Sequence, residues 1–223
     1  PAITCPDNIT VNTDAGTCGA AVAISTVDFD DNCSGASLAW SISGDTPDAS
    51  GDGQIGTRIF SVGETTVELT ATDAVNNTTT CSFTVTVNDN QAPQISCPTP
   101  EASYTADAGQ CYSSLSFTAT ASDYCGVASI QYYIGSPETQ ITFPYHFPAG
   151  STVVTARATD INGLTGDCTF TVLVIDDQKP VVSGCPSNIV RSSSAGICTA
   201  VVSWTEPTAT DNCTTSASLI KYR

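Results

Sequence analysis

The spacing of the cysteines constrains the fold of this chain more than any other feature. Eleven cysteines occur in 223 residues, and they fall into three successive groups. The intervals between the first three members are 13 and 15, then 14 and 14, then 13 and 15 residues. The groups are Cys5, Cys18, Cys33 and Cys81; Cys97, Cys111, Cys125 and Cys168; and Cys185, Cys198 and Cys213. This recurrence predicts a tandem array of one repeated unit.

The sequence around these cysteines repeats as well. The motifs "TDAGTC", "ADAGQC" and "SSAGIC" end at each second cysteine, and "DDNC", "SDYC" and "TDNC" end at each third. An acidic cluster, a proline and Cys-Pro recur in "NDNQAPQISCP" and "IDDQKPVVSGCP". Equivalent starts at Pro1, Pro93 and Pro180 then predict repeats at 1–92, 93–179 and 180–223, and the third stops before a fourth cysteine.

Short β-strands are expected throughout each repeat. Segments such as "TTVELTAT", "CSFTVTV" and "TVVTARAT" alternate apolar and polar residues, and Gly, Asn, Asp and Pro separate them. No segment has a sustained helical stripe of apolar residues. About seven short strands in about 90 residues match an immunoglobulin-like sandwich. We therefore predict an all-β chain of tandem immunoglobulin-like β-sandwiches, stabilised by disulfide bonds.

The order of these motifs resembles the hyalin repeat, or HYR module, over essentially the whole chain. The match includes the four cysteines, the Cys-Pro start, the Asp-Asn-Cys box and the Ala-Thr-Asp box. The resemblance implies an immunoglobulin-like extracellular module of adhesion and matrix proteins. Such proteins include hyaline-layer proteins of animals and very large surface proteins of gliding Bacteroidetes. Its expected partners are neighbouring HYR repeats of the same longer chain. The second repeat departs from the pattern, since Tyr124 stands where the others have asparagine.

Disulfide bonds persist in oxidising compartments, so the cysteines predict an extracellular location at the cell surface. No cysteine lies in a CxxC motif or beside a histidine, which argues against zinc. If each "DAG" turn closes a hairpin of the first two strands, the second cysteine lies far from the first and third. A strand of eight residues spans about 26 Å, whereas bonded cysteines need Cα atoms within about 7 Å. This geometry predicts Cys5–Cys33, Cys18–Cys81, Cys97–Cys125, Cys111–Cys168 and Cys185–Cys213, with Cys198 unpaired.

Composition excludes several classes of function. The chain has 6 Lys and Arg against 22 Asp and Glu, a formal charge of −16, which disfavours nucleic acid as a partner. No apolar run approaches the roughly 18 residues of a membrane span, so we expect no membrane insertion. No signal peptide is recognisable, and we expect a segment of a longer exported protein. No hydrolase, protease or nucleotide motif occurs, and we predict that the chain is not an enzyme.

Acidic residues cluster where one repeat should meet the next. Calcium takes 6–8 oxygen ligands in irregular geometry, so it is the candidate cofactor of these clusters. The "NDNQAP" linker also resembles the calcium-binding linker of cadherins. The alternative is that Asp and Asn only form turns, through hydrogen bonds to the backbone. The candidate calcium ligands are Asp89, Asp123 and Asp160 at the first joint, Asp176, Asp177 and Asp211 at the second, and Asp31 and Asp73 in the first repeat.

Two functions fit these features. The first is a structural stalk or filament segment of a large cell-surface or secreted adhesin, stiffened by disulfides, by joint prolines that fix φ, and by calcium. The second is a binding module for a glycan or a surface protein, which would use the aromatic side chains of the second repeat. Its candidate residues are Tyr132, Tyr133 and Tyr145, although core packing explains alternate members of that set equally well.

Overall fold

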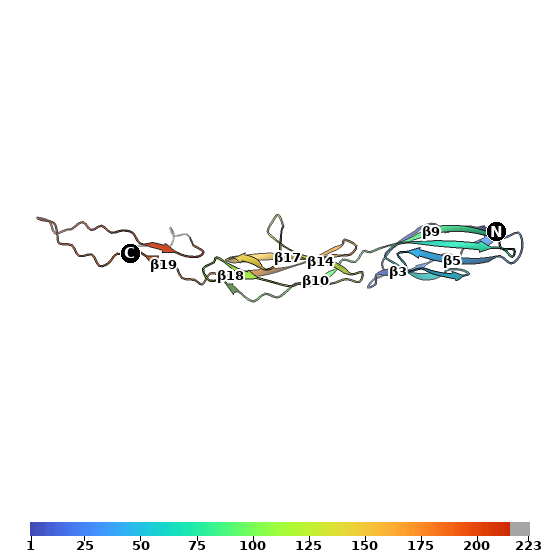
Figure 1. Cartoon of the computed structure of the whole chain (residues 1–223), viewed down its shortest axis with the longest axis horizontal. Coiled ribbons are helices and arrows are strands. Elements are labelled where there is room, and N and C mark those ends of the chain that lie inside the picture. Colours follow the sequence, from blue (N-terminus) through green and yellow to red (C-terminus); the bar gives the residue numbers. More distant parts are fainter. Residues whose placement is uncertain (215–223) are drawn as a thin grey trace. The chain divides into compact units, whose positions relative to one another are not determined.

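The computed structural model describes residues 1–214, and every regular element among them is a β-strand (Figure 1). This confirms the predicted all-β fold. None of these residues belongs to a helix long and apolar enough to cross a membrane. The chain divides into two compact units that do not coincide with the sequence repeats. The first unit comprises Pro1–Ser96, Thr120–Ile130 and Arg157–Asp167, and the second comprises Cys97–Ala119, Gln131–Ala156 and the described residues from Cys168 onward.

The first repeat forms a sandwich around one five-stranded sheet, in the order β2-β9-β8-β5-β6. Two small sheets, β1-β4 and β3-β7, complete it. β2 runs parallel to β9, and the other pairs are antiparallel. The strands are β1 (Ala2–Ile3), β2 (Ile9–Asn12), β3 (Gly19–Ala23), β4 (Phe29–Asp30), β5 (Ser37–Gly44), β6 (Ala49–Asp52), β7 (Thr57–Ser61), β8 (Gly63–Thr72) and β9 (Thr78–Asn88).

Alternation along these strands directs one face of each sheet into a shared core. In β8, Val67 and Leu69 are fully buried, whereas Glu68 between them is exposed. Phe60 from β7 is also fully buried in the same cluster, so the small sheet packs face to face with the large one. Burial of each such side chain stabilises the fold by roughly 1.5–3 kcal/mol.

The second repeat follows the same plan. Its five-stranded sheet has the order β11-β18-β17-β14-β15, with β11 parallel to β18, and the small sheets are β10-β13 and β12-β16. The strands are β10 (Gln94–Ser96), β11 (Tyr104–Thr105), β12 (Tyr112–Leu115), β13 (Thr120–Ser122), β14 (Val127–Ile134), β15 (Thr139–Ile141), β16 (Tyr145–Pro148), β17 (Gly150–Asp160) and β18 (Thr165–Ile175).

Most aromatic residues of the second repeat pack against one another. The Tyr132 ring lies 4.7 Å from Phe143, and its hydroxyl accepts a hydrogen bond from the Ala119 N–H. The Tyr145 ring lies 4.9 Å from Phe147, which is fully buried. Tyr133 is half-buried, and its hydroxyl donates to Gln131. Tyr132 and Tyr145 therefore contribute to packing, as the alternative reading expected, while the ligand surface of Tyr132, Tyr133 and Tyr145 stays a prediction.

The third repeat contributes one small sheet. β19 (Val181–Ser183) pairs with β20 (Thr208–Thr210), and this pair corresponds to β1-β4 and β10-β13. No other strand occurs in the described part of the predicted repeat 180–223, and residues 215–223 lie outside it.

The disulfide bonds differ from the predicted set. The predicted pairs Cys5–Cys33, Cys18–Cys81, Cys97–Cys125, Cys111–Cys168 and Cys185–Cys213 are all wrong. The bonds are Cys5–Cys81, Cys18–Cys125, Cys97–Cys168 and Cys111–Cys213, with Cα distances of 5.9, 4.7, 5.8 and 4.8 Å. Cys33, Cys185 and Cys198 are free and exposed. Two of the four bonds therefore join cysteines of successive repeats.

The error came from the assumed hairpin between the first two strands. β2 instead pairs in parallel with β9, and Ile9 lies opposite Val85. The first cysteine of the repeat consequently lies beside the early part of β9, where Cys81 is found. Cys18 follows β2 and so lies at the opposite end of the repeat, where the third cysteine of the next repeat meets it.

Replacement of Phe60 by alanine should lower the free energy of unfolding of the first repeat by about 3–5 kcal/mol, because this side chain is fully buried. The adjacent Ile59 is 75% exposed, so Ile59→Ala should change that free energy by less than about 0.5 kcal/mol. Urea unfolding followed by the fluorescence of the buried Trp40, in a Trp204→Phe background, measures both. Equal losses would contradict the two faces assigned to β7.

Candidate functional site

The candidate site lies at the joints between repeats, where turns, linkers and loops are connected by hydrogen bonds and disulfide bonds. Each joint has three parts: a turn that ends at the second cysteine of one repeat, the linker after its last strand, and the loop before the third cysteine of the next repeat. The first joint comprises residues 13–18, 88–93 and 122–126, all in the first compact unit. The second joint comprises residues 106–111, 175–180 and 210–214, all in the second unit.

The turn has the same backbone conformation in each repeat. In the first, Asp14 N–H donates to Gly19 O at 2.8 Å, and Thr17 N–H donates to Asp14 O at 3.1 Å. The intervening Gly16 has a φ of 79°, and its equivalents Gly109 and Gly196 have φ values of 72° and 81°. L side chains rarely adopt this left-handed region, which explains the glycine in all three motifs.

A glutamine of the linker clamps the turn at the first joint. Its position is fixed by Asp89, whose Oδ1 accepts the Gln91 N–H at 3.0 Å. Gln91 Oε1 accepts the Gly16 N–H at 2.9 Å, and its Nε2 lies 3.1 Å from Asp14 O and 3.2 Å from Thr17 O. The linker is thereby tied to the end of its own repeat.

The second joint repeats this clamp. Asp176 Oδ1 accepts the Gln178 N–H at 3.1 Å, Gln178 Oε1 accepts the Gly109 N–H at 2.7 Å, and Gln178 Nε2 donates to Asp107 O at 3.0 Å. The sequence-based reasoning missed both glutamines. The sequence feature that could have identified these glutamines is the Asp-x-Gln motif, which recurs in "NDNQAP" and "IDDQKP".

The loop of the following repeat completes each joint with a disulfide bond. Asp123 Oδ1 accepts the N–H groups of Cys125 and Gly126 at 2.7 and 3.1 Å, and this turn presents Cys125 to Cys18. In the second joint, Asp211 Oδ1 accepts the N–H groups of Cys213 and Thr214 at 3.0 and 2.9 Å. Cys213 bonds to Cys111 in the same way.

The residue before the third cysteine contacts the turn in both joints, by different chemistry. Asn212 Nδ2 donates to Gln110 O at 2.6 Å and to Asp176 Oδ1 at 3.2 Å. Tyr124 replaces this asparagine in the second repeat and lies over Gly16, where an added Cβ would be 3.6 Å from its Cζ and Oη atoms. A ring contact therefore substitutes for the amide hydrogen bonds.

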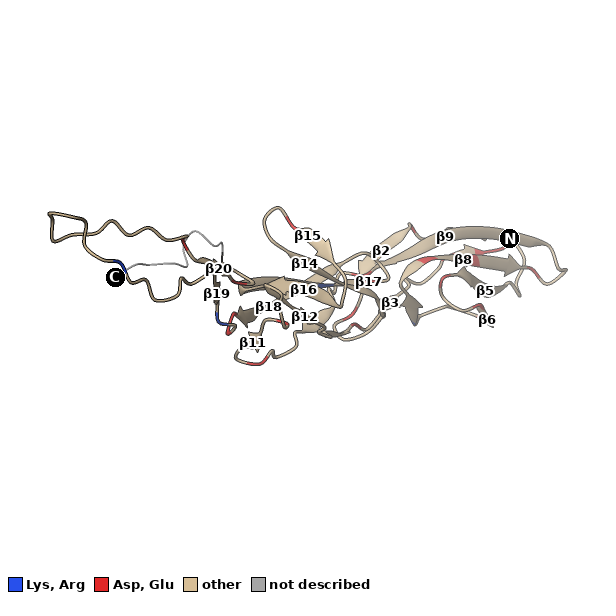
Figure 2. Ribbon diagram, turned by 60° about the vertical axis from the view of Figure 1, so that its left-hand side comes forward, with Lys and Arg blue, Asp and Glu red and all other residues tan. Residues whose placement is uncertain are grey.

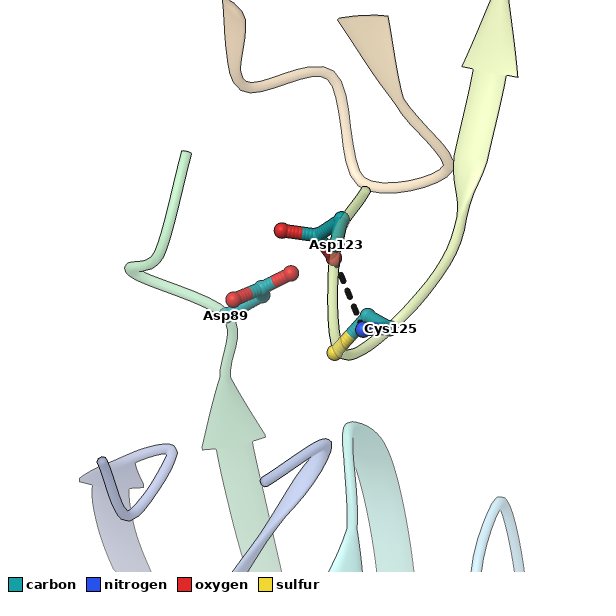
Figure 3. Close-up of side chains that lie close together, drawn as sticks. All are labelled: Asp89, Asp123 and Cys125. Carbon is teal, nitrogen blue, oxygen red and sulfur yellow. Dashed lines mark hydrogen bonds between the residues drawn. The ribbon is translucent and has the colours of Figure 1, made fainter. Parts of the chain in front are cut away.

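Two of the predicted calcium ligands come together at the first joint. Carboxylate oxygens of Asp89 and Asp123 and the Sγ of Cys125 lie within 4.8 Å of one another, and Figure 3 shows the two carboxylates facing each other. Within residues 1–214 this is the one such group of three. Cys125 is bonded to Cys18, so its sulfur is not a thiolate ligand. The group therefore offers two carboxylates to a cation.

Asp160 lies outside that group but has an unusual environment. Its side chain is 2% exposed, and its Oδ1 accepts the N–H groups of Asn162 and Leu164. Its Oδ2 and that of Asp89 are the buried side-chain oxygens in the described chain without a hydrogen-bond partner. The turn of Asp160 contacts the Asp123 loop, because Ile161 N–H donates to Gly126 O at 3.1 Å.

Acidic residues lie mainly in loops and at strand ends (Figure 2). Asp73 corresponds to Asp160, but both of its oxygens have partners, Oδ2 through the amide of Asn77 at 2.7 Å. Asp31 Oδ1 accepts the Cys33 N–H, and its Oδ2 is 3.0 Å from the Pro1 amino group. The remaining predicted ligands, Asp176, Asp177 and Asp211, form no comparable group within residues 1–214.

Loss of the glutamine clamp should expose the turn to solvent. In Gln91→Ala the Gly16 amide loses its acceptor, so its hydrogen exchange should quicken by about fivefold or more, since a lost hydrogen bond costs about 1 kcal/mol or more. Gln94→Ala, an exposed residue of the adjacent strand, is the matched control. Exchange at Gly16 that is unchanged by Gln91→Ala would contradict the clamp.

Acid should destabilise the first repeat through Asp73. The side-chain amide of Asn77, with the backbone N–H groups of Asn77 and Val75, holds the pKa of Asp73 below 3.8. A depressed folded-state pKa contributes stability above the unfolded value, and this is lost as pH falls through the folded value. The temperature of thermal unfolding should therefore fall as the pH is lowered below about 4. This fall should be smaller in Asp73→Asn than in the exposed control Asp48→Asn. An equal shift in both variants would contradict this assignment.

Comparisons with known proteins agree with the repeat structure. The HYR domain family matches residues 1–87, 88–174 and 175–222. Hyalin of Strongylocentrotus purpuratus is 35% identical over 159 residues, 68% of this chain and 13% of hyalin. Hyalin of Lytechinus variegatus is 35% identical over 66% of this chain and 28% of that protein. The chain thus spans less than a third of these relatives.

Solved structures with similar features have low sequence identity. Fibronectin(III)-like modules of Clostridium thermocellum CbhA share 14% identity with a TM-score of 0.34, over 78% of this chain and 94% of theirs. Human CDH23 EC21-23 shares 15% identity with a TM-score of 0.36, over 94% of this chain and 78% of that one. The family match and the disulfide-bonded repeats carry the conclusion that this chain belongs to the HYR domain family of extracellular, adhesion-type repeat modules.

Proposed function

We propose that this chain is a non-enzymatic, tension-bearing segment of a large cell-surface or secreted adhesion protein. The observation that carries the proposal is the disulfide bond from each turn to the loop of the next repeat, Cys18–Cys125 and Cys111–Cys213. A covalent bond at the joint holds successive repeats together even when their hydrogen bonds are broken.

The position of these bonds determines how tension passes through a repeat. In the second repeat, Cys125 bonds backward and Cys111 bonds forward, so the covalent path between joints is the segment from Cys111 to Cys125. Fourteen residues separate these cysteines. They extend to no more than about 5 nm at roughly 3.5 Å per residue. Strands outside this segment are not part of the path and are not pulled out.

The nearly constant interval between the second and third cysteines fits this role. It is 15, 14 and 15 residues in the three repeats, whereas the third and fourth cysteines are 48 and 43 residues apart. Only the interval between the second and third cysteines sets the covalent length between joints. Selection for a fixed length under tension would restrict this interval and leave the interval between the third and fourth cysteines free to vary.

A divalent cation, calcium, is proposed as a second stabiliser of the first joint. Two carboxylates that face each other within 4.8 Å repel at neutral pH, and a bound cation would remove that repulsion. The unpartnered Oδ2 of Asp89 is available as a ligand atom. The buried Asp160 is the proposed third carboxylate, and backbone carbonyls and water would supply the remaining oxygens that calcium needs.

Single-molecule stretching between residues 1 and 214 tests the tension-bearing role. In the oxidised chain the shortest covalent path has about 30 residues, so its contour length should not exceed about 11 nm. Opening both joints with Cys18→Ser and Cys111→Ser should double this contour length to about 23 nm, and full reduction should extend it to about 75 nm in total. An oxidised contour well above 11 nm would refute the proposal.

Calorimetric titration of calcium into the chelator-treated chain tests the cation. We expect calcium binding to give a measurable heat. Asp89→Asn or Asp123→Asn should weaken the affinity for calcium at least tenfold, since each variant removes a charged ligand. Asp48→Asn makes the same change in net charge at an exposed site and should leave binding unaltered. The absence of heat in the unmodified chain would leave these carboxylates as turn formers alone.

A further inference from the structure

The first joint holds two cysteines beside its two facing carboxylates. The Cys125 Sγ lies within 4.8 Å of carboxylate oxygens of Asp89 and Asp123 (Figure 3). Cys18 is bonded to Cys125, and all four residues belong to the first compact unit. Two sulfurs and two carboxylates form a ligand set for zinc, which takes four Cys, His, Asp or Glu ligands in a tetrahedron. No local spacing reveals this set, because Cys18 and Cys125 are 107 positions apart in the sequence.

Hydrogen bonds already orient both carboxylates. Asp123 Oδ1 accepts the N–H groups of Cys125 and Gly126, and Asp89 Oδ1 accepts the Gln91 N–H. Outer hydrogen bonds of this kind hold metal ligands in place in proteins. Asp89 Oδ2 is buried and has no hydrogen-bond partner. Burial of such an oxygen is costly, and a bound cation offsets that cost.

The second joint lacks this group, and one substitution contributes to the difference. Asn212 donates its side-chain amide to Oδ1 of Asp176, which is the equivalent of Asp89. Tyr124 stands at the position of Asn212 in the first joint and has no amide to donate. The Asp89 carboxylate therefore lacks this donor. Within residues 1–214, Asp176 and Asp211 belong to no group of three potential metal ligands.

We propose that reduction of the Cys18–Cys125 disulfide converts the first joint into a zinc site. Its four ligands are the two thiolates and one oxygen each of Asp89 and Asp123. Thiolates select zinc over calcium, which prefers oxygen ligands. The metal connects the turn and linker of the first repeat to the loop of the second, so the joint keeps a cross-link when its covalent bond is lost. The inference is independent of the tension-bearing role and of calcium binding.

The disulfide must open first, because the thiolate is the form of cysteine that binds a metal. A thiol reductant attacks one sulfur of the bond, and a second reductant thiol then releases the first as a reductant disulfide. Two reductant thiols thereby lose two protons and two electrons, and both protein cysteines become thiols. Zinc then displaces two protons from these thiols.

Zinc requires only a small contraction of the group. Zn–S bonds are about 2.3 Å and Zn–O bonds about 2.0–2.2 Å, which places neighbouring ligand atoms of a tetrahedral site roughly 3.3–3.8 Å apart. The two oxygens and the Cys125 Sγ lie within 4.8 Å of one another, so their separations close by no more than about 1.5 Å. After reduction the two sulfurs move apart to van der Waals contact, which is the spacing that a shared metal needs.

Cys18→Ser tests the site without a reductant, since it frees the Cys125 thiol and leaves the other three disulfides in place. Competition with a chromogenic chelator measures the zinc affinity of the full chain. Cys18→Ser should bind zinc at least tenfold more tightly than the unmodified oxidised chain, a gain of about 1.4 kcal/mol. Cys111→Ser is the matched control, because it frees the Cys213 thiol at the joint without a comparable group, and it should show no gain.

Two further measurements identify the ligands. Cobalt(II) bound to Cys18→Ser should show a sulfur-to-cobalt charge-transfer band, which the double variant Cys18→Ser/Cys125→Ser should lack. The unmodified chain reduced with a phosphine, which is converted to its oxide, should bind zinc at least tenfold more tightly than its reduced Asp89→Asn variant. Mass spectrometry of unreduced peptides verifies the three remaining disulfides of Cys18→Ser.

Three outcomes would overturn the zinc site. An equal gain in Cys111→Ser would show that any freed joint thiol suffices. A zinc affinity of the reduced chain that Asp89→Asn leaves unchanged would exclude the carboxylate as a ligand. A cobalt spectrum of Cys18→Ser without the sulfur band would exclude Cys125.

Discussion

The parallel pairing of an early strand with the last strand of each repeat determines which groups meet at the joints. β2 lies along the end of β9 with Asn12 opposite Asn88, and the pairing continues as Thr13 N–H donates to Asn88 O at 2.9 Å. The turn after β2 and the linker after β9 therefore leave the sandwich side by side. In the second repeat, Ala106 N–H donates to Ile175 O at 2.9 Å and has the same effect. This arrangement brings the linker glutamine to the turn and directs the turn cysteine toward the next repeat.

The joint is held by several interactions of different strength. Each aspartate of the linker and of the loop uses one oxygen to fix a local turn, and the glutamine hydrogen bonds are each worth about 1 kcal/mol. These interactions position the cysteines, and the disulfide then fixes the contact covalently. The change from Asn212 to Tyr124 is tolerated because each still contacts the turn, one by hydrogen bonds and the other by its ring.

Sequence reasoning predicted the features that depend on local pattern. Alternating segments predicted the strands, and recurring motifs predicted the repeats and the clusters at their joints, where Asp89 and Asp123 do meet. The disulfide pairs were wrong because the pairing of β2 with β9 joins residues about 75 apart, which no local pattern reveals. The prediction also confined each disulfide to one repeat, although Cys18 bonds to Cys125. Gln91 and Gln178 were missed because their roles depend on a turn that is distant in the sequence.

The most direct test of this account is a disulfide map of the oxidised chain. Free thiols would be blocked, the protein digested without reduction, and the linked peptides identified by mass spectrometry. The account predicts Cys18 linked to Cys125 and Cys111 linked to Cys213, with Cys33, Cys185 and Cys198 carrying the blocking group. Linkage of Cys18 to Cys33 or Cys81 would confine the disulfides within single repeats and contradict the covalent joint.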